Sequence, residues 1–280
     1  MLRWIVFPKN ALADLKHPII ANFYATFAIG ILVLSANFLI IGRNIPVAKY
    51  LWLIGTAFTV FFSIHTPFIM FSGEHVKIEH INPGWFIPPI GLVIIPMVGS
   101  AMIEQFSGGM RDFVIFINYF VWGSGFFLYL ALLAITLYRF ILHPPLPRIF
   151  APVIWMNLGP VGVGTVSLVG LIKHTGFIAT KEPFYVFGFI LRGFGIWWLL
   201  MAVLLTLHYI KKMRIPYNLS WWAFTFPLGA YVAASRTIGA IFKLPIVDHI
   251  GFALYFLLFA LWLLTAVNTF RHGYRGGFSE

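Results

Sequence analysis

Residues Trp221–Gly229 read WWAFTFPLG and place Pro227 in the middle of an apolar run that otherwise has the composition of a membrane helix. A proline inside a helix has no N–H to donate and leaves the carbonyl four residues earlier, here that of Ala223, without its usual partner. In lipid, such a break is tolerated only where neighbouring helices or water satisfy the freed backbone. The stretch therefore predicts a broken helix in the interior of a membrane protein.

The composition supports that setting, because 60% of the 280 residues are hydrophobic and only 10% are charged, with a mean hydropathy of +0.91. A chain of this kind does not form a water-soluble globule. We predict an all-α integral membrane protein in which residues 1–280 form a single transmembrane channel or transporter domain. Apolar runs of about 20 residues predict about eight transmembrane helices in four hairpins, near residues 18–41, 46–70, 82–102, 113–140, 149–172, 184–210, 219–238 and 246–270.

The net charge of +11 would suggest a nucleic-acid partner in a soluble protein, but here the basic residues flank apolar runs and are better interpreted as topology signals. Of the 19 Lys and Arg residues, eleven lie on the side of the two termini, seven lie on the other side, and Arg192 lies within a span. Cytoplasmic loops carry an excess of Lys and Arg. We therefore predict a multi-pass protein of the cell membrane with both termini in the cytoplasm, and no nucleic-acid partner.

The residue types needed for most chemistry are scarce. The chain has no cysteine, which excludes disulfides and thiolate sites, and its eight acidic residues include no pair within a span. No nucleophile motif or phosphate-binding loop is present. We expect neither an enzyme nor a bound metal or cofactor.

Prolines follow an alternating pattern along the predicted spans. The third, fifth and seventh spans contain interior prolines, whereas the fourth, sixth and eighth contain none. Pro89, Pro160 and Pro227 are 71 and 67 residues apart, which is about the length of one helical hairpin. The pattern predicts broken helices gathered around an interior path, with straight helices outside them against lipid.

Glycines accompany these prolines, at Gly91, Gly162 and Gly229. Small residues leave room for a pore wall, but close packing between membrane helices uses the same residues. Both interpretations remain open from the sequence.

Four stretches together resemble a known family: HPIIANF at residues 17–23, NPGWFIPPIG at 82–91, NLGPVGVG at 157–164, and WWAFTFPLG. They are similar to the tellurite-resistance and dicarboxylate transporter family, which includes plant slow-type anion channels, bacterial tellurite-resistance channels and yeast malate permeases. The resemblance implies ten helices in five hairpins, with proline-kinked inner helices around a central anion pore, in a homotrimer within the lipid bilayer. It also implies that Phe226 closes the pore as a gate.

The other positions that we expect at the pore lining or at a kink are Pro227, Gly229, Pro160, Gly162, Pro89, Gly91, Phe23 and Phe27. The first span has no interior proline where relatives often have one, and Phe27 stands near that place. The family has one more hairpin than this chain, so we expect two further helices to be encoded upstream of Met1.

Three alternatives to a passive anion channel remain. A proton-coupled dicarboxylate carrier or a sulfite- or tellurite-related transporter would need a titratable residue in its path, and the broken spans have none at mid-depth. A haem-bearing redox subunit would need two facing histidines, for which His65 and His208 are the candidates. Arg192, within the sixth span, could attract anions, but that span is straight, so we expect pairing with a neighbouring helix or snorkelling to the interface.

Overall fold

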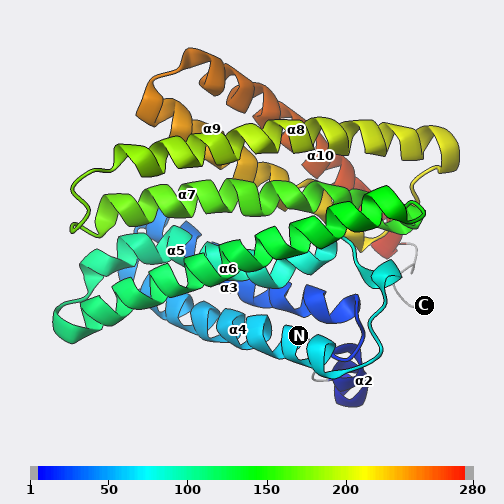
Figure 1. Cartoon of the computed structure of the whole chain (residues 1–280), viewed down its shortest axis with the longest axis horizontal. Helices are drawn as coiled ribbons and strands as arrows, with labels where there is room; N and C mark the ends of the chain where they lie inside the picture. The colour runs from blue at the N-terminus through cyan, green and yellow to red at the C-terminus, as the bar shows by residue number, and fades with distance from the viewer. Residues whose placement is uncertain (1–5, 275–280) are drawn as a thin grey trace. The chain divides into compact units, whose positions relative to one another are not determined.

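The computed structural model describes residues 6–274, and this part of the chain is helical without strands (Figure 1). The α-helices are α2 (Pro8–Asp14), α3 (Ile20–Ile40), α4 (Ile45–Ser72), α5 (Ile87–Met102), α6 (Gly108–Leu142), α7 (Leu158–His174), α8 (Glu182–Met213), α9 (Phe226–Phe242) and α10 (Pro245–Tyr274). Short 3₁₀ segments join them: η1 (Ile78–His80), η2 (Pro83–Phe86), η3 (Ile103–Gln105), η4 (Arg148–Asn157) and η5 (Leu219–Phe224).

Seven helical segments within residues 6–274 are long and apolar enough to cross a membrane. They are α3, α4, the run from η2 to η3, α6, the run from η4 to α7, α8 and α10. The remaining predicted span is divided at Thr225 into η5, of 6 residues, and α9, of 17 residues. The prediction of an all-α integral membrane protein is confirmed.

The chain forms two compact units, and it passes from one to the other after His143, within α7 and near the start of α8. Unit 1 contains the chain up to His143 together with Ser167–Phe184. Unit 2 contains Pro144–Val166 and the chain from Tyr185 onward.

Broken and straight spans differ in burial, as the proline pattern predicts. In the run from η2 to η3, 89% of the most apolar stretch is buried, and in the run from η4 to α7 the share is 83%. The corresponding shares are 33% in α3 and α4, 28% in α6 and α8, and 17% in α10. Straight helices therefore present most of their apolar surface outward, where lipid solvates it.

Three of the prolines occupy a different local position from the one that the sequence suggests, whereas Pro96 lies in the interior of α5 and Pro152 in that of η4. Pro227 is the second residue of α9, Pro89 is the third residue of α5, and Pro160 is the third residue of α7. Each of these α-helices directly follows a 3₁₀ segment, with Thr225 alone intervening before α9. The first N–H groups of an α-helix have no intrahelical partner, so a proline there loses no hydrogen bond. The breaks are thus transitions from 3₁₀ to α-helix, and these prolines lie in the first turn of each α-helix.

Two further details depart from the alternating pattern. The straight helix α4 contains Pro67 in its interior. Helix α3 is continuous from Ile20 to Ile40, so Phe27 does not mark a break.

In unit 1, η2 is held by a short hydrogen-bonded turn around Asn82. The Asn82 Oδ1 atom accepts from the Gly84 N–H at 2.8 Å, and its Nδ2 donates to the His80 carbonyl at 2.9 Å. The Trp85 indole N–H donates to the same carbonyl at 3.0 Å. These bonds satisfy one of the orphan donors at the start of the broken span.

The same turn recurs in unit 2 at the start of η5. Asn218 Oδ1 accepts from the Ser220 N–H at 2.8 Å, and Asn218 Nδ2 donates to the Pro216 carbonyl at 3.4 Å. The Trp221 indole N–H donates to that carbonyl at 3.0 Å. Trp221 is therefore an anchor of the broken span, in addition to any interfacial role.

Asn82→Ala should lower the free energy of unfolding by about 1–2 kcal/mol, because it removes an N-cap at a buried site. Asn82 is 1% exposed. Asn268→Ala is a matched control, since Asn268 is half-buried on α10 and its Nδ2 only bonds the Leu264 carbonyl of its own helix. Thermal unfolding in detergent measures both. Equal midpoints for the two variants would contradict a structural role for the turn.

Candidate functional site

Phe226 begins α9 directly after the break at Thr225. Its side chain is 37% exposed, and it makes no ring contact among residues 6–274. Phe224, two residues earlier, is 5% exposed, and its ring meets those of Trp155 at 5.5 Å and Trp221 at 5.9 Å, edge to face in both cases. Phe224 is thus a core residue of unit 2, while Phe226 is held by few neighbours.

In unit 2, the broken span that runs from η4 into α7 packs closely against the backbone of α9. A Cβ atom added to Gly162 would lie 2.5 Å from the carbonyl carbon of Ala230 on α9, so only a hydrogen fits between the two backbones. Pro160, two residues earlier, is buried. Gly229 differs, because a Cβ atom there would meet only Leu258 Cδ2, at 3.6 Å. Gly162 therefore takes part in close helix packing. The packing around Gly229, in contrast, leaves room for a side-chain atom.

In unit 1, the predicted site residues pack against their neighbours in the same unit. A Cβ atom added to Gly91 would lie 2.8 Å from Thr59 Cγ2 on α4. A Cβ atom added to Gly125 on α6 would lie 2.6 Å from the carbonyl oxygen of Pro89, so α5 and α6 are also in close contact at that point. Close packing thus accounts for Gly91 and Gly162, and a role of the glycines in a pore wall stays a prediction.

The two phenylalanines of α3 have separate contacts. The Phe23 ring lies against the backbone of η2, since a Cβ atom added to Gly84 would be 3.2 Å from Phe23 Cζ. The Phe27 ring meets that of Phe58 on α4 edge to face, at 5.9 Å between centroids. The predicted site residues fall into two groups, Phe23, Phe27, Pro89 and Gly91 in unit 1 and Pro160, Gly162, Phe226, Pro227 and Gly229 in unit 2. Their role in lining a pore stays a prediction.

Arg192 pairs with a neighbouring helix, as expected, and does not snorkel. Its Nε donates to Ser235 Oγ on α9 at 3.1 Å, and the residue is 1% exposed. The guanidinium carbon lies 5.5 Å from the centre of the Tyr231 ring. A cation is therefore enclosed inside unit 2.

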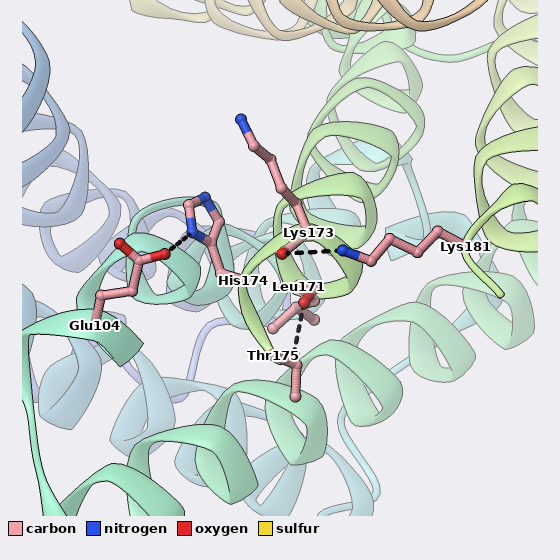
Figure 2. Close-up of polar contacts among 6 residues, drawn as sticks. All are labelled: Glu104, Leu171, Lys173, His174, Thr175 and Lys181. Atoms are coloured by element: carbon pink, nitrogen blue, oxygen red, sulfur yellow. Dashed lines mark hydrogen bonds and ion pairs between the residues drawn. The ribbon is translucent and has the colours of Figure 1, made fainter. Parts of the chain in front are cut away.

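A charged cluster at the end of α7 in unit 1 was not apparent from the sequence. His174 Nδ1 and Glu104 Oε1 are 2.6 Å apart, although the two residues are 70 positions apart in the chain. Figure 2 shows the Lys181 ammonium directed at the Lys173 carbonyl, at 3.5 Å, while the side chain of Lys173 extends away from both contacts. Since Lys173 is exposed, it adds positive potential at this end of the unit.

The two histidines of the haem alternative lie in ordinary surroundings. His65 is half-buried on α4 and stacks on Phe61 at 5.1 Å between ring centroids. His208 is exposed on α8.

Comparisons with known proteins point to transport. Residues 1–270 match the family model described as "SLAC1: Voltage-dependent anion channel". Two uncharacterized transporters of Methanocaldococcus jannaschii are 52% and 49% identical to this chain over 276 residues, which cover 99% of this chain and 80% and 81% of the two relatives. A sulfite efflux pump of Arthroderma benhamiae is 26% identical over 95% of this chain and 76% of the relative. The malic acid transport protein of Schizosaccharomyces pombe is 22% identical over 78% of this chain and 53% of the relative.

Proposed function

Because the chain belongs to the voltage-dependent anion channel family, we propose that it passively conducts small anions such as chloride and nitrate, with small carboxylates as further candidates. The family match over residues 1–270 carries the proposal, and it agrees with the resemblance found in the sequence. The chain is a multi-pass integral membrane protein, and its named relatives are transporters. We further propose a single transport domain in the cell membrane, both termini in the cytoplasm, and a homotrimer.

Passive conduction is favoured over proton coupling by where the titratable groups lie. A proton-coupled carrier needs a titratable residue along its path. Within the described broken spans, the acidic residues and histidines are Glu104, in η3, and His174, at the last position of α7. Both lie at span ends, and they pair with each other.

Phe226 is the proposed gate, because an apolar ring closes a narrow path by excluding water. Its exposure of 37% and its lack of ring partners among the described residues support this role, since the ring is not committed to the core. The adjacent Pro227 fixes the first turn of α9 and hence the direction in which the ring leaves the backbone.

Reconstitution into liposomes tests the function. The purified protein should pass chloride and nitrate under an imposed voltage without a proton gradient, and liposomes without protein serve as the control. Malate and sulfite flux should be measured in parallel, because relatives bear the names malic acid transport protein and sulfite efflux pump. Flux that requires a proton gradient would instead show a coupled carrier.

Lys173→Gln should lower anion conductance about twofold at low salt, because it removes an exposed positive charge that attracts anions. The difference from wild type should disappear near 1 M salt, where the Debye length is about 3 Å. Conductance measured at both salt concentrations separates this effect from loss of protein. A reduction that persists at high salt would contradict an electrostatic role.

A further inference from the structure

Within residues 6–274, Arg192 is a buried charge without a carboxylate partner. It is 1% exposed, and seven of the eight acidic residues of the chain lie within residues 6–274, where none forms an ion pair with it. An arginine stays protonated in proteins, so the side chain does not escape the cost of burial by losing its charge. A buried cation of this kind calls for a compensating negative group.

The two side chains that contact the guanidinium, those of Ser235 and Tyr231, are already committed to other hydrogen bonds. Ser235 Oγ accepts from Arg192 Nε at 3.1 Å and donates to the Tyr231 carbonyl at 3.0 Å. The Tyr231 hydroxyl donates to the Arg192 carbonyl at 2.8 Å, which leaves only its ring face, 5.5 Å away, for the guanidinium. Arg192 Nη2 is buried and has no hydrogen-bond partner among the described residues. One edge of the guanidinium therefore lacks an acceptor among the described residues.

We propose that this edge of Arg192 binds a small monovalent anion, such as chloride or nitrate, as a resident counter-ion inside unit 2. An anion supplies both the acceptor that Nη2 lacks and the negative charge that neutralises the guanidinium. A water molecule would supply only the acceptor. The site goes beyond the proposed conduction, because the bound anion need not be one that permeates.

Anion-dependent thermal stability of the detergent-solubilised protein tests the site. At constant ionic strength, replacing gluconate with chloride or nitrate should raise the unfolding midpoint of the wild type by about 5 °C once the anion reaches ~100 times its Kd. Arg192→Met keeps a long apolar stem and removes the charge, so its midpoint should not respond to the anion. Arg236→Met is the matched control and should respond as wild type does, because Arg236 is exposed and pairs with Asp248 at 3.1 Å.

An unresponsive wild type, or an Arg192→Met protein that responds as strongly as wild type, would overturn the proposal. If Arg192→Met does not fold, Ser235→Ala decides the matter. This variant removes the acceptor of Nε, which leaves a second N–H for the anion, so the midpoint should depend more steeply on anion concentration. An unchanged or shallower dependence would equally overturn the site.

The result is separable from the proposed function. Midpoints are measured without any flux, so a protein that binds the anion but conducts none would contradict the channel alone. A protein that conducts anions but whose midpoint ignores them would contradict the Arg192 site alone.

Discussion

Phe226→Ala should raise the anion conductance of the reconstituted protein by about tenfold or more, which corresponds to a barrier lowered by about 1.4 kcal/mol. The physical reason is that the phenyl ring excludes water and hydrated ions from a narrow path, and alanine does not. Stability should change little, because the ring is 37% exposed, makes no ring contact among the described residues, and alanine suits a helix. Single-channel or liposome flux measurements, normalised to the amount of monodisperse protein, give the result.

Phe184→Ala is the matched control for this prediction. Phe184 is 39% exposed and lies in the first turn of α8, as Phe226 lies in the first turn of α9, but α8 is a straight span. Its conductance should equal that of wild type. An equal rise in both variants, or no rise in a well-folded Phe226→Ala protein, would remove Phe226 from the gate.

Phe224→Ala distinguishes a gate from a core residue only two positions away. Its ring is 5% exposed and packs edge to face on Trp155 and Trp221, so its removal should cost about 3–5 kcal/mol of stability. A lower unfolding midpoint in detergent is the expected readout. Phe224→Ala is therefore unsuitable as a neutral control for conductance.

Gly162→Ala should destabilise the protein by about 1–3 kcal/mol or more, because the new methyl group must displace backbone. The added Cβ would lie 2.5 Å from the Ala230 carbonyl carbon, and backbone has no flexible end that can move aside. Gly229→Ala should instead be neutral or stabilising by up to about 1 kcal/mol, since alanine favours the helix. At Gly229 the added Cβ would meet only Leu258, at 3.6 Å.

Thermal unfolding of the two glycine variants side by side measures this difference. Both replace a glycine in the first half of an α-helix that follows the 3₁₀ segment of a broken span, so helix propensity favours alanine in both. Only the neighbouring backbone differs. Equal midpoints would show that α7 and α9 are not in close contact at Gly162.

The positions of the broken spans were predictable because proline acts locally. The stretches that contain Pro89, Pro160 and Pro227 do change from 3₁₀ to α-helix. The two runs long enough to cross the membrane, from η2 to η3 and from η4 to α7, are mostly buried, whereas the straight spans are mostly exposed. The exact placement of each proline in the first turn was not predictable, because it depends on the preceding 3₁₀ segment. That segment is anchored by hydrogen bonds such as those of Asn82 and Asn218, which the sequence does not display.

The candidate site was predictable only as a set of residue types. Glycine beside proline is compatible with a pore wall and with close packing, and only the distance from Gly162 to Ala230 identifies a packing contact. Composition and hydropathy likewise do not distinguish the burial of Phe224 from that of Phe226, although the family resemblance singles out Phe226 as the gate. Phe224 is covered by Trp221, three residues earlier, and by Trp155, which is about 70 residues away in the chain.

The sequence by itself determined the membrane setting, the helical class, the location of the breaks and the family. Hydropathy and proline geometry are properties of consecutive residues, and the family motifs are consecutive as well. Tertiary structure alone decided that Arg192 is enclosed without a carboxylate partner from the described part of the chain, that His174 meets Glu104, and that Gly162 touches α9. Each of these facts depends on the rotation and packing of helices distant in the chain, and side-chain contacts across such distances leave no local pattern in one sequence.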